Sequence, residues 1–165
     1  MVRHYAKCIM ILVFILCTAV AFAQTPAEAF KAKTSAAAKI VEQLTPAQVM
    51  DMIKSKKDVM IVDVREKNEV EAGKIEAPNY LHSPRGLVDV IAAKGALSPD
   101  KKYVIYCKKG SRGLLAAAAL KELGFENVYN LDGGIHAWMD AGYPITNSLG
   151  TFKTVPYELT GCAEN

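Results

Sequence analysis

The stretch that most limits the fold of this chain is an apolar strand that leads through a cysteine into a buried helix. The strand is Tyr103–Tyr106, the cysteine is Cys107, and the helix is Arg112–Leu123. A short basic turn containing Gly110 separates the cysteine from the helix. A β-rich apolar run followed at once by a helical one predicts a strand–turn–helix unit. Cys107 is therefore expected to face the N-terminus of that helix.

This position favours a reactive cysteine. Unpaired backbone N–H groups and the positive end of the helix dipole stabilise an anion. Lys108, Lys109 and Arg112 add charge of the same sign, and each influence favours the nucleophilic thiolate. The alternative is a small buried structural cysteine. Such a residue does not need a cationic, glycine-containing turn, whereas an oxyanion-binding turn does. The anion-binding loop is predicted to comprise Lys108, Lys109, Gly110, Ser111 and Arg112.

Strands alternate with helices along most of the chain. Val59–Val64 is almost wholly apolar, as expected for a parallel strand covered on both faces. The other predicted elements are helices at Ala47–Ser55, Glu66–Ala72, Gly86–Lys94 and Ile135–Asp140, and strands at Asn79–Ser83 and Asn127–Leu131. This alternation predicts a single α/β domain with a central, mostly parallel sheet flanked by helices.

The same topology brings candidate site residues together. In open α/β sheets, ligands bind beyond the carboxyl ends of the strands. Cys107 ends one strand, and Asp63 and Arg65 stand at the end of another. We therefore expect these residues to share one edge of the sheet.

The N-terminus is typical of a secretory signal peptide. Arg3 and Lys7 precede an uncharged apolar run, which closes on the small-residue pattern Ala21-Phe22-Ala23. The run is shorter than the ~20 residues of a membrane-spanning helix. We expect cleavage before Gln24, with an uncleaved anchor as the alternative. Export then predicts a periplasmic or secreted protein whose mature form does not span the membrane.

Four regions follow from these features. They are a signal peptide at 1–23, a helical leader or linker at 24–44, a domain at 45–146 and an unassigned C-terminal tail at 147–165.

Charge and composition exclude several functions. The chain has 20 basic and 17 acidic residues, and two of the basic ones lie in the signal peptide, so the remainder is nearly neutral. Nothing here indicates a nucleic-acid partner. His82 and His136 have no ligand partner at a metal-like spacing, so we expect neither a metal site nor a cofactor.

Two of the four cysteines leave with the signal peptide, and Cys107 and Cys162 remain. In an oxidising compartment they could form a disulfide. Cys162 could also resolve an oxidised Cys107, or play no part. These alternatives stay open.

The combined pattern resembles the single-domain rhodanese family over about residues 45–146. The matching pieces, in the order and spacing of that family, are Val59–Glu66, Glu69 with Gly73–Ile75, Val104–Arg112 and Leu131–Trp138. Departures occur at Val70, where the family usually has an aromatic residue, and in the segment Gly73–Pro78, where it usually has Gly-His-Ile followed by a small-residue turn.

The resemblance implies a sulfurtransferase with Cys107 as the carrier of a persulfide. The loop from Lys108 to Arg112 would cradle the sulfur and attract thiosulfate or a similar anionic donor. Asp63 and Arg65 match a supporting acidic–basic pair. The acceptor would be a thiol or cyanide, and a protein that bears a persulfide is a further candidate partner.

Two other functions remain open. Cysteine phosphatases and arsenate reductases share the cysteine–loop–arginine pattern, but the phosphatases place one residue more between the two. Here four residues separate Cys107 from Arg112, and none of them is acidic. The other alternative is a non-enzymatic or redox relay module that binds a partner. Such modules typically lack the cysteine that is present here.

Overall fold

The computed structural model describes residues 25–55 and 58–154. The chain divides into two compact units, the first ending at Ala32 and the second beginning at Lys33. Helix α2 (Pro26–Ala37) runs across this boundary. Within the described ranges, no helix has the length and apolar character that crossing a membrane requires. The second unit contains the candidate site.

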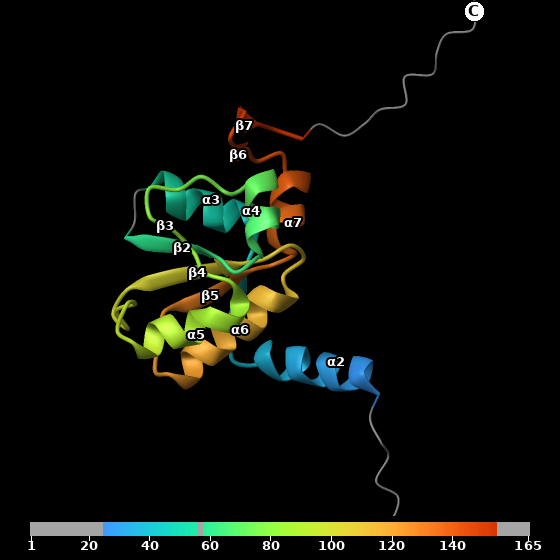
Figure 1. The fold of residues 1–165 in the computed structure, drawn as a ribbon, viewed down its shortest axis with the longest axis vertical. Helices are drawn as coiled ribbons and strands as arrows, with labels where there is room; N and C mark the ends of the chain where they lie inside the picture. The colour runs from blue at the N-terminus through green and yellow to red at the C-terminus, as the bar shows by residue number, and fades with distance from the viewer. Residues whose placement is uncertain (1–24, 56–57, 155–165) are drawn as a thin grey trace, which may run out of the picture. The chain divides into compact units, whose positions relative to one another are not determined.

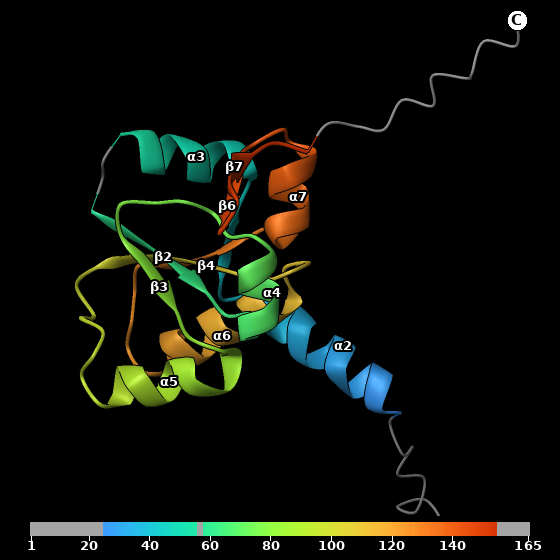
Figure 2. The ribbon, with the colours of Figure 1, turned by 45° about the horizontal axis from the view of Figure 1, so that its top comes forward.

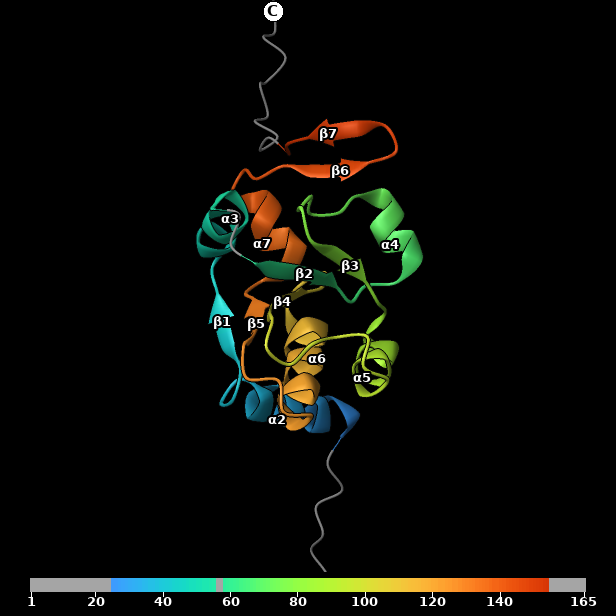
Figure 3. The same cartoon turned by 90° about the vertical axis from the view of Figure 1, so that its left-hand side faces the viewer.

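The centre of this unit is a five-stranded parallel sheet with the order β1-β5-β4-β2-β3 (Figures 1 and 3). Its strands are β1 (Glu42–Leu44), β2 (Val59–Asp63), β3 (Tyr80–His82), β4 (Lys102–Tyr106) and β5 (Val128–Leu131). The predicted α/β class with a central parallel sheet is confirmed. Strand β4, which directly precedes Cys107, lies in the middle of the sheet.

Helices cover both faces of the sheet, as Figures 1 and 2 show. One side carries α3 (Pro46–Lys54), α4 (Lys67–Ala72) and α7 (Gly134–Asp140), and the other carries α5 (Arg85–Ala93) and α6 (Ser111–Glu122). Most predicted boundaries agree to within one or two residues. Helix α3 begins where Thr45 and Gln48 form a reciprocal capping box.

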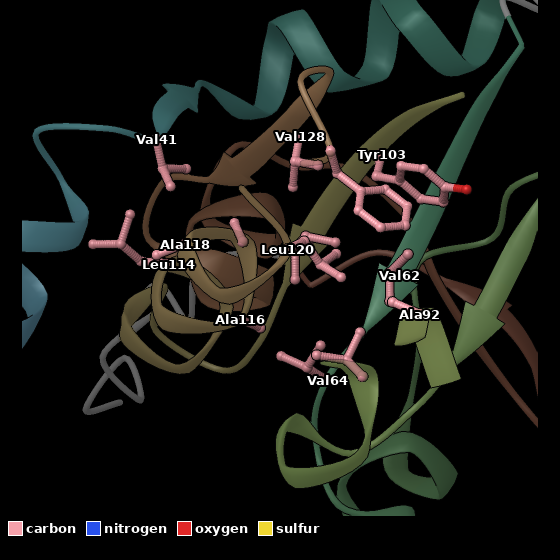
Figure 4. Close-up of a cluster of buried hydrophobic side chains, with 14 of the residues drawn as sticks. Val41, Val62, Val64, Ala92, Tyr103, Leu114, Ala116, Ala118, Leu120 and Val128 are labelled. Atoms are coloured by element: carbon pink, nitrogen blue, oxygen red, sulfur yellow. The ribbon is translucent and has the colours of Figure 1, made fainter. Parts of the chain in front are cut away.

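Alternation along the strands explains why both faces are apolar. Val62 of β2 and Ile105 of β4 belong to one core cluster, whereas Ile61 and Val104 belong to the other. Successive side chains of a strand point to opposite faces, so a strand covered on both faces is apolar throughout. Figure 4 shows the first cluster, in which side chains of β2 lie among those of α5 and α6.

Two regions differ from the prediction. Glu42–Leu44, expected in a leader or linker, forms β1 and pairs with Tyr129–Leu131 of β5. The sheet therefore begins before residue 45. The strand has only three residues, and only Leu44 among them is buried. A run this short shows no alternation of apolar and polar residues from which a strand could be predicted.

The start of the predicted tail is also ordered in the structure. Strands β6 (Ile145–Asn147) and β7 (Gly150–Phe152) form an antiparallel pair. A bridge between Lys74 and Thr146 ties this pair to the segment after α4. The signal peptide predicted at 1–23 and the end of the tail at 155–165 lie outside the described residues.

Candidate active site

Cys107 directly follows β4 and is buried, with only 1% of its surface exposed. Neighbouring strand β2 pairs with β4 in a register that sets Asp63 opposite Tyr106. The residues after these two positions, Val64–Arg65 and Cys107, thus leave the sheet at one edge. This is the arrangement that the strand order requires for the expected site.

A backbone N–H group donates to the cysteine sulfur. The nitrogen of Gly110 lies 3.2 Å from Cys107 Sγ. Gly110 has a φ of +95°, and α6 begins at the next residue. A positive φ is readily adopted by glycine, so this residue can turn the loop back toward the sulfur. The sulfur therefore accepts a hydrogen bond where the positive end of a twelve-residue helix begins.

Helix α7 holds the other side of the loop. The Ile135 N–H donates to the Cys107 carbonyl at 2.8 Å, and the His136 N–H donates to the Lys108 carbonyl at 3.2 Å. These bonds fix the direction of two loop peptides. This close approach leaves no room for a side chain at Gly134, because an added Cβ would collide with the Cys107 and Lys108 carbonyl groups. Gly134 was not among the predicted site residues, although two adjacent glycines are a signal of such a close backbone approach.

Arg112 pairs with a residue that lies 43 positions away. Its Nη1 and Nη2 atoms donate to Glu69 Oε2 and Oε1, each at 2.7 Å. Hydrogen bonds to Glu69 raise the pKa of Arg112, and the nearby Cys107 sulfur acts in the same direction. The sequence predicted that Arg112 binds substrate. In the structure its bidentate contact is with Glu69, which was noted only as part of the resemblance.

Asp63 and Arg65 form a buried ion pair beneath this contact. Arg65 donates from Nε and Nη2 to the Asp63 carboxylate, the shortest distance being 2.6 Å. Its remaining donors reach the carbonyls of Glu69 and Gly73 at 2.9 and 2.8 Å. Burial lowers the pKa of Arg65, but the Asp63 carboxylate outweighs it and the net direction is upward.

The result is a continuous series of contacts from Asp63 through Arg65 and Glu69 to Arg112. The Asp63 carboxylate is fully buried against Arg65 rather than presented to Cys107. The pair thus supports the segment that holds Glu69.

The two lysines of the loop remain available to solutes. Lys108 and Lys109 are exposed, and neither enters an ion pair among the described residues. Ser111, at the start of α6, is half-buried. Exposed positive charge beside a buried sulfur can attract an anion toward it.

The Glu69–Arg112 pair predicts a defined pH dependence of stability. Hydrogen bonds from Arg112 lower the pKa of Glu69 from 4.5 to about 2. A lowered folded-state pKa gives stability that is complete above the unfolded value and lost as the pH falls through the folded value. We expect Glu69→Gln to reduce the free energy of unfolding by about 1 kcal/mol. The difference from wild type should be constant from pH 5 to 8 and shrink between about pH 4.5 and 2, as measured by urea unfolding.

Glu71→Gln is the matched control. Glu71 pairs with Lys67 at 3.7 Å, but both side chains are largely exposed, at 65% and 86%. Its replacement should leave stability nearly unchanged across the same range. Equal losses in the two variants, or a Glu69→Gln difference that persists at pH 2, would contradict the assignment.

Two further points concern metal ligands and the second cysteine. In residues 25–55 and 58–154, no three His, Cys, Asp or Glu side chains gather as a metal site. Cys162 lies outside these ranges, so its three alternatives stay open.

Comparisons with known proteins point to one family. The model of the rhodanese-like domain family matches residues 45–141. A sulfurtransferase of Allochromatium vinosum is 33% identical over 111 residues, which cover 67% of this chain and all of that protein. The thiosulfate sulfurtransferase GlpE of Pseudoalteromonas translucida is 34% identical over 62% of this chain and 91% of its own length.

Solved structures show the same fold. A polysulfide-sulfur transferase from Wolinella succinogenes has a TM-score of 0.63 and 34% identity, over 72% of this chain and 88% of that one. A protein of unknown function from Rhodopseudomonas palustris, described as a possible tyrosine phosphatase, has a TM-score of 0.65 and 37% identity, over 74% and 97%. The family model spans most of the chain, and two of the relatives are named sulfurtransferases. The structure places the cysteine loop at the carboxyl edge of a parallel sheet. The chain therefore belongs to the rhodanese-like domain family.

Proposed function

We propose that this protein is a sulfurtransferase that carries sulfane sulfur as a persulfide on Cys107. The sulfur comes from thiosulfate or a persulfide donor and passes to a thiol or cyanide. The observation that carries the proposal is the hydrogen bond from the Gly110 N–H to Cys107 Sγ at 3.2 Å, inside a loop of four residues. This N–H is in place to donate to the sulfur when the sulfur acts as the nucleophile.

The loading step with thiosulfate balances without a further reactant. The Cys107 thiolate attacks the sulfane sulfur, and a new S–S bond forms at Sγ. The S–S bond of thiosulfate breaks, and its electron pair leaves with sulfite. The terminal sulfur of the resulting persulfide is again an anion. The positive end of α6 and the loop cations favour negative charge in both the starting and the loaded states.

Mass spectrometry of the intact protein tests the proposal directly. After incubation with thiosulfate and removal of small molecules, we expect a gain of one sulfur atom, located on the peptide that contains Cys107. Addition of cyanide should return the original mass. A protein that keeps its original mass with thiosulfate and with polysulfide would contradict the proposal and favour a relay or adaptor role.

The loop lysines are expected to recruit the anionic donor. A charge that only attracts the substrate stabilises the bound substrate and the transition state equally. Lys108→Ala and Lys109→Ala should therefore raise KM for thiosulfate several-fold with little change in kcat. Salt screens exposed charges, so added salt should raise the wild-type KM and have less effect in the double variant. Steady-state thiosulfate:cyanide assays at several ionic strengths measure both effects. Salt-independent wild-type kinetics with an unchanged KM in both variants would point to an uncharged or protein donor.

A cysteine phosphatase is the second candidate because of the description attached to the Rhodopseudomonas palustris neighbour. Two observations favour sulfur transfer over it. The loop between Cys107 and Arg112 is one residue shorter than in the phosphatases, and the guanidinium of Arg112 is engaged by Glu69. Assay of a generic aryl phosphate decides the matter, since a phosphatase would hydrolyse it and leave Cys107 without added sulfur.

A further inference from the structure

A pocket of about 260 Å³ lies beside the cysteine loop, on the α7 side of the sheet. Its apolar lining residues come from three separate elements, and they are Ala72 of α4, Ile135 and Met139 of α7, and Ile145 of β6. Strand β6, at the C-terminal end of the predicted domain, thus supplies part of the wall.

The pocket reaches the loop that holds the sulfur. Lys108, the residue after Cys107, is among its lining residues. So is Ile135, whose N–H donates to the Cys107 carbonyl. A molecule in the pocket would therefore have one end next to the sulfur-carrying loop.

The lining does not match thiosulfate, which has no apolar surface to bury. Burial of apolar surface is favourable only when the ligand has such surface. The charges of Arg65 and Glu69, which also line the pocket, are paired with Asp63 and Arg112. Lys108 carries the remaining charge, and it is exposed and unpaired among the described residues. The pocket therefore suits an apolar body with an anionic group.

We propose that this pocket binds the sulfur acceptor, a small organic thiol with an apolar body and a carboxylate. This inference rests on the proposed function. The acceptor gives its thiol proton to water, and its thiolate attacks the terminal sulfur of the Cys107 persulfide. A new S–S bond forms on the acceptor. The bond to Sγ breaks, its electron pair returns to Cys107 as the thiolate, and an organic persulfide leaves.

The experiment uses protein that has been loaded with sulfur by incubation with thiosulfate, after which the remaining thiosulfate is removed. Sulfur transfer is timed with mercaptopropionate and mercaptohexanoate, and with mercaptohexanol as the uncharged match. Each extra methylene that enters an apolar pocket increases discrimination, so we expect mercaptohexanoate to exceed mercaptopropionate at least tenfold in kcat/KM. Mercaptohexanol should react several-fold more slowly than mercaptohexanoate, and Lys108→Ala should abolish that difference.

Ala72→Leu and Ala93→Leu form a matched pair of variants. Both alanines are exposed at the last position of a helix, but Ala93 lies on α5, which packs on the opposite face of the sheet. Leucine at position 72 fills the pocket and should reduce the ratio of mercaptohexanoate to mercaptopropionate to about twofold. Leucine at position 93 should leave that ratio as in the wild type. A variant that loads less sulfur slows transfer to both acceptors equally, so the ratio of the two rates does not change.

The possible failures are distinct. Wild-type protein that takes no sulfur from thiosulfate or polysulfide refutes the proposed function, and the acceptor assignment falls with it. Protein that loads normally but transfers to both acids at equal rates refutes the acceptor assignment alone and favours a protein acceptor. Equal effects of the two alanine substitutions would also refute it.

Discussion

Replacement of Cys107 by serine is expected to abolish both persulfide formation and thiosulfate:cyanide sulfur transfer, while the protein remains folded. A serine hydroxyl stays protonated at neutral pH and cannot replace the thiolate as nucleophile. The two side chains are similar in size, and the Gly110 N–H that reaches the sulfur can also donate to a hydroxyl oxygen. Cys107 packs in the core, so a loss of about 1 kcal/mol in stability is expected.

Three measurements check this result. They are the steady-state rate, the intact mass after thiosulfate treatment, and a thermal unfolding curve that shows a cooperative transition. Cys162→Ser is the appropriate companion variant, since Cys162 is the other cysteine left after the predicted cleavage. Loading that survives in Cys107→Ser but disappears in Cys162→Ser would transfer the carrier role to the C-terminal cysteine.

Local sequence pattern was sufficient to predict the centre of this fold. β2 and β4 are buried on both faces, so their apolar runs are unambiguous, and Cys107 follows from the end of one of them. Parallel pairing then places Asp63 and Arg65 at the same edge without further information. Each of these steps depends on neighbours within a few residues.

The parts that were missed depend on contacts between distant segments. Strand β1 exists because Leu44 completes the core and Glu42–Leu44 pairs with β5. Glu69 acquires its role only when α4 is packed close enough for its carboxylate to meet Arg112. Neither residue type nor spacing signals such a partner, because surface glutamates and arginines are common and mostly unpaired or solvent-exposed.

Gly134→Ala is expected to have the second large effect, on both stability and activity. An added Cβ would lie 2.8 Å from the carbon and oxygen of the Lys108 peptide and closer still to the Cys107 carbonyl oxygen. These are backbone atoms of the cysteine loop, so the loop itself must move. The residue also has a φ of +62°, which is unfavourable for alanine. We expect a loss of about 3 kcal/mol in stability. Sulfur transfer should fall at least tenfold, because the Gly110 N–H no longer aligns with the sulfur.

Gly142→Ala separates the collision from the backbone strain. Gly142 follows α7 and has a φ of +75°, but an added Cβ there meets nothing within 4 Å. It should lose only about 1 kcal/mol from strain and retain wild-type kinetics at a temperature where it is fully folded. Rates are compared there, with unfolding curves establishing the folded fraction of each variant. If both substitutions reduce stability and rate equally, positive φ alone accounts for Gly134. A selective loss in Gly134→Ala means that the packing of α7 against the loop peptides sets the position of the donor to the sulfur.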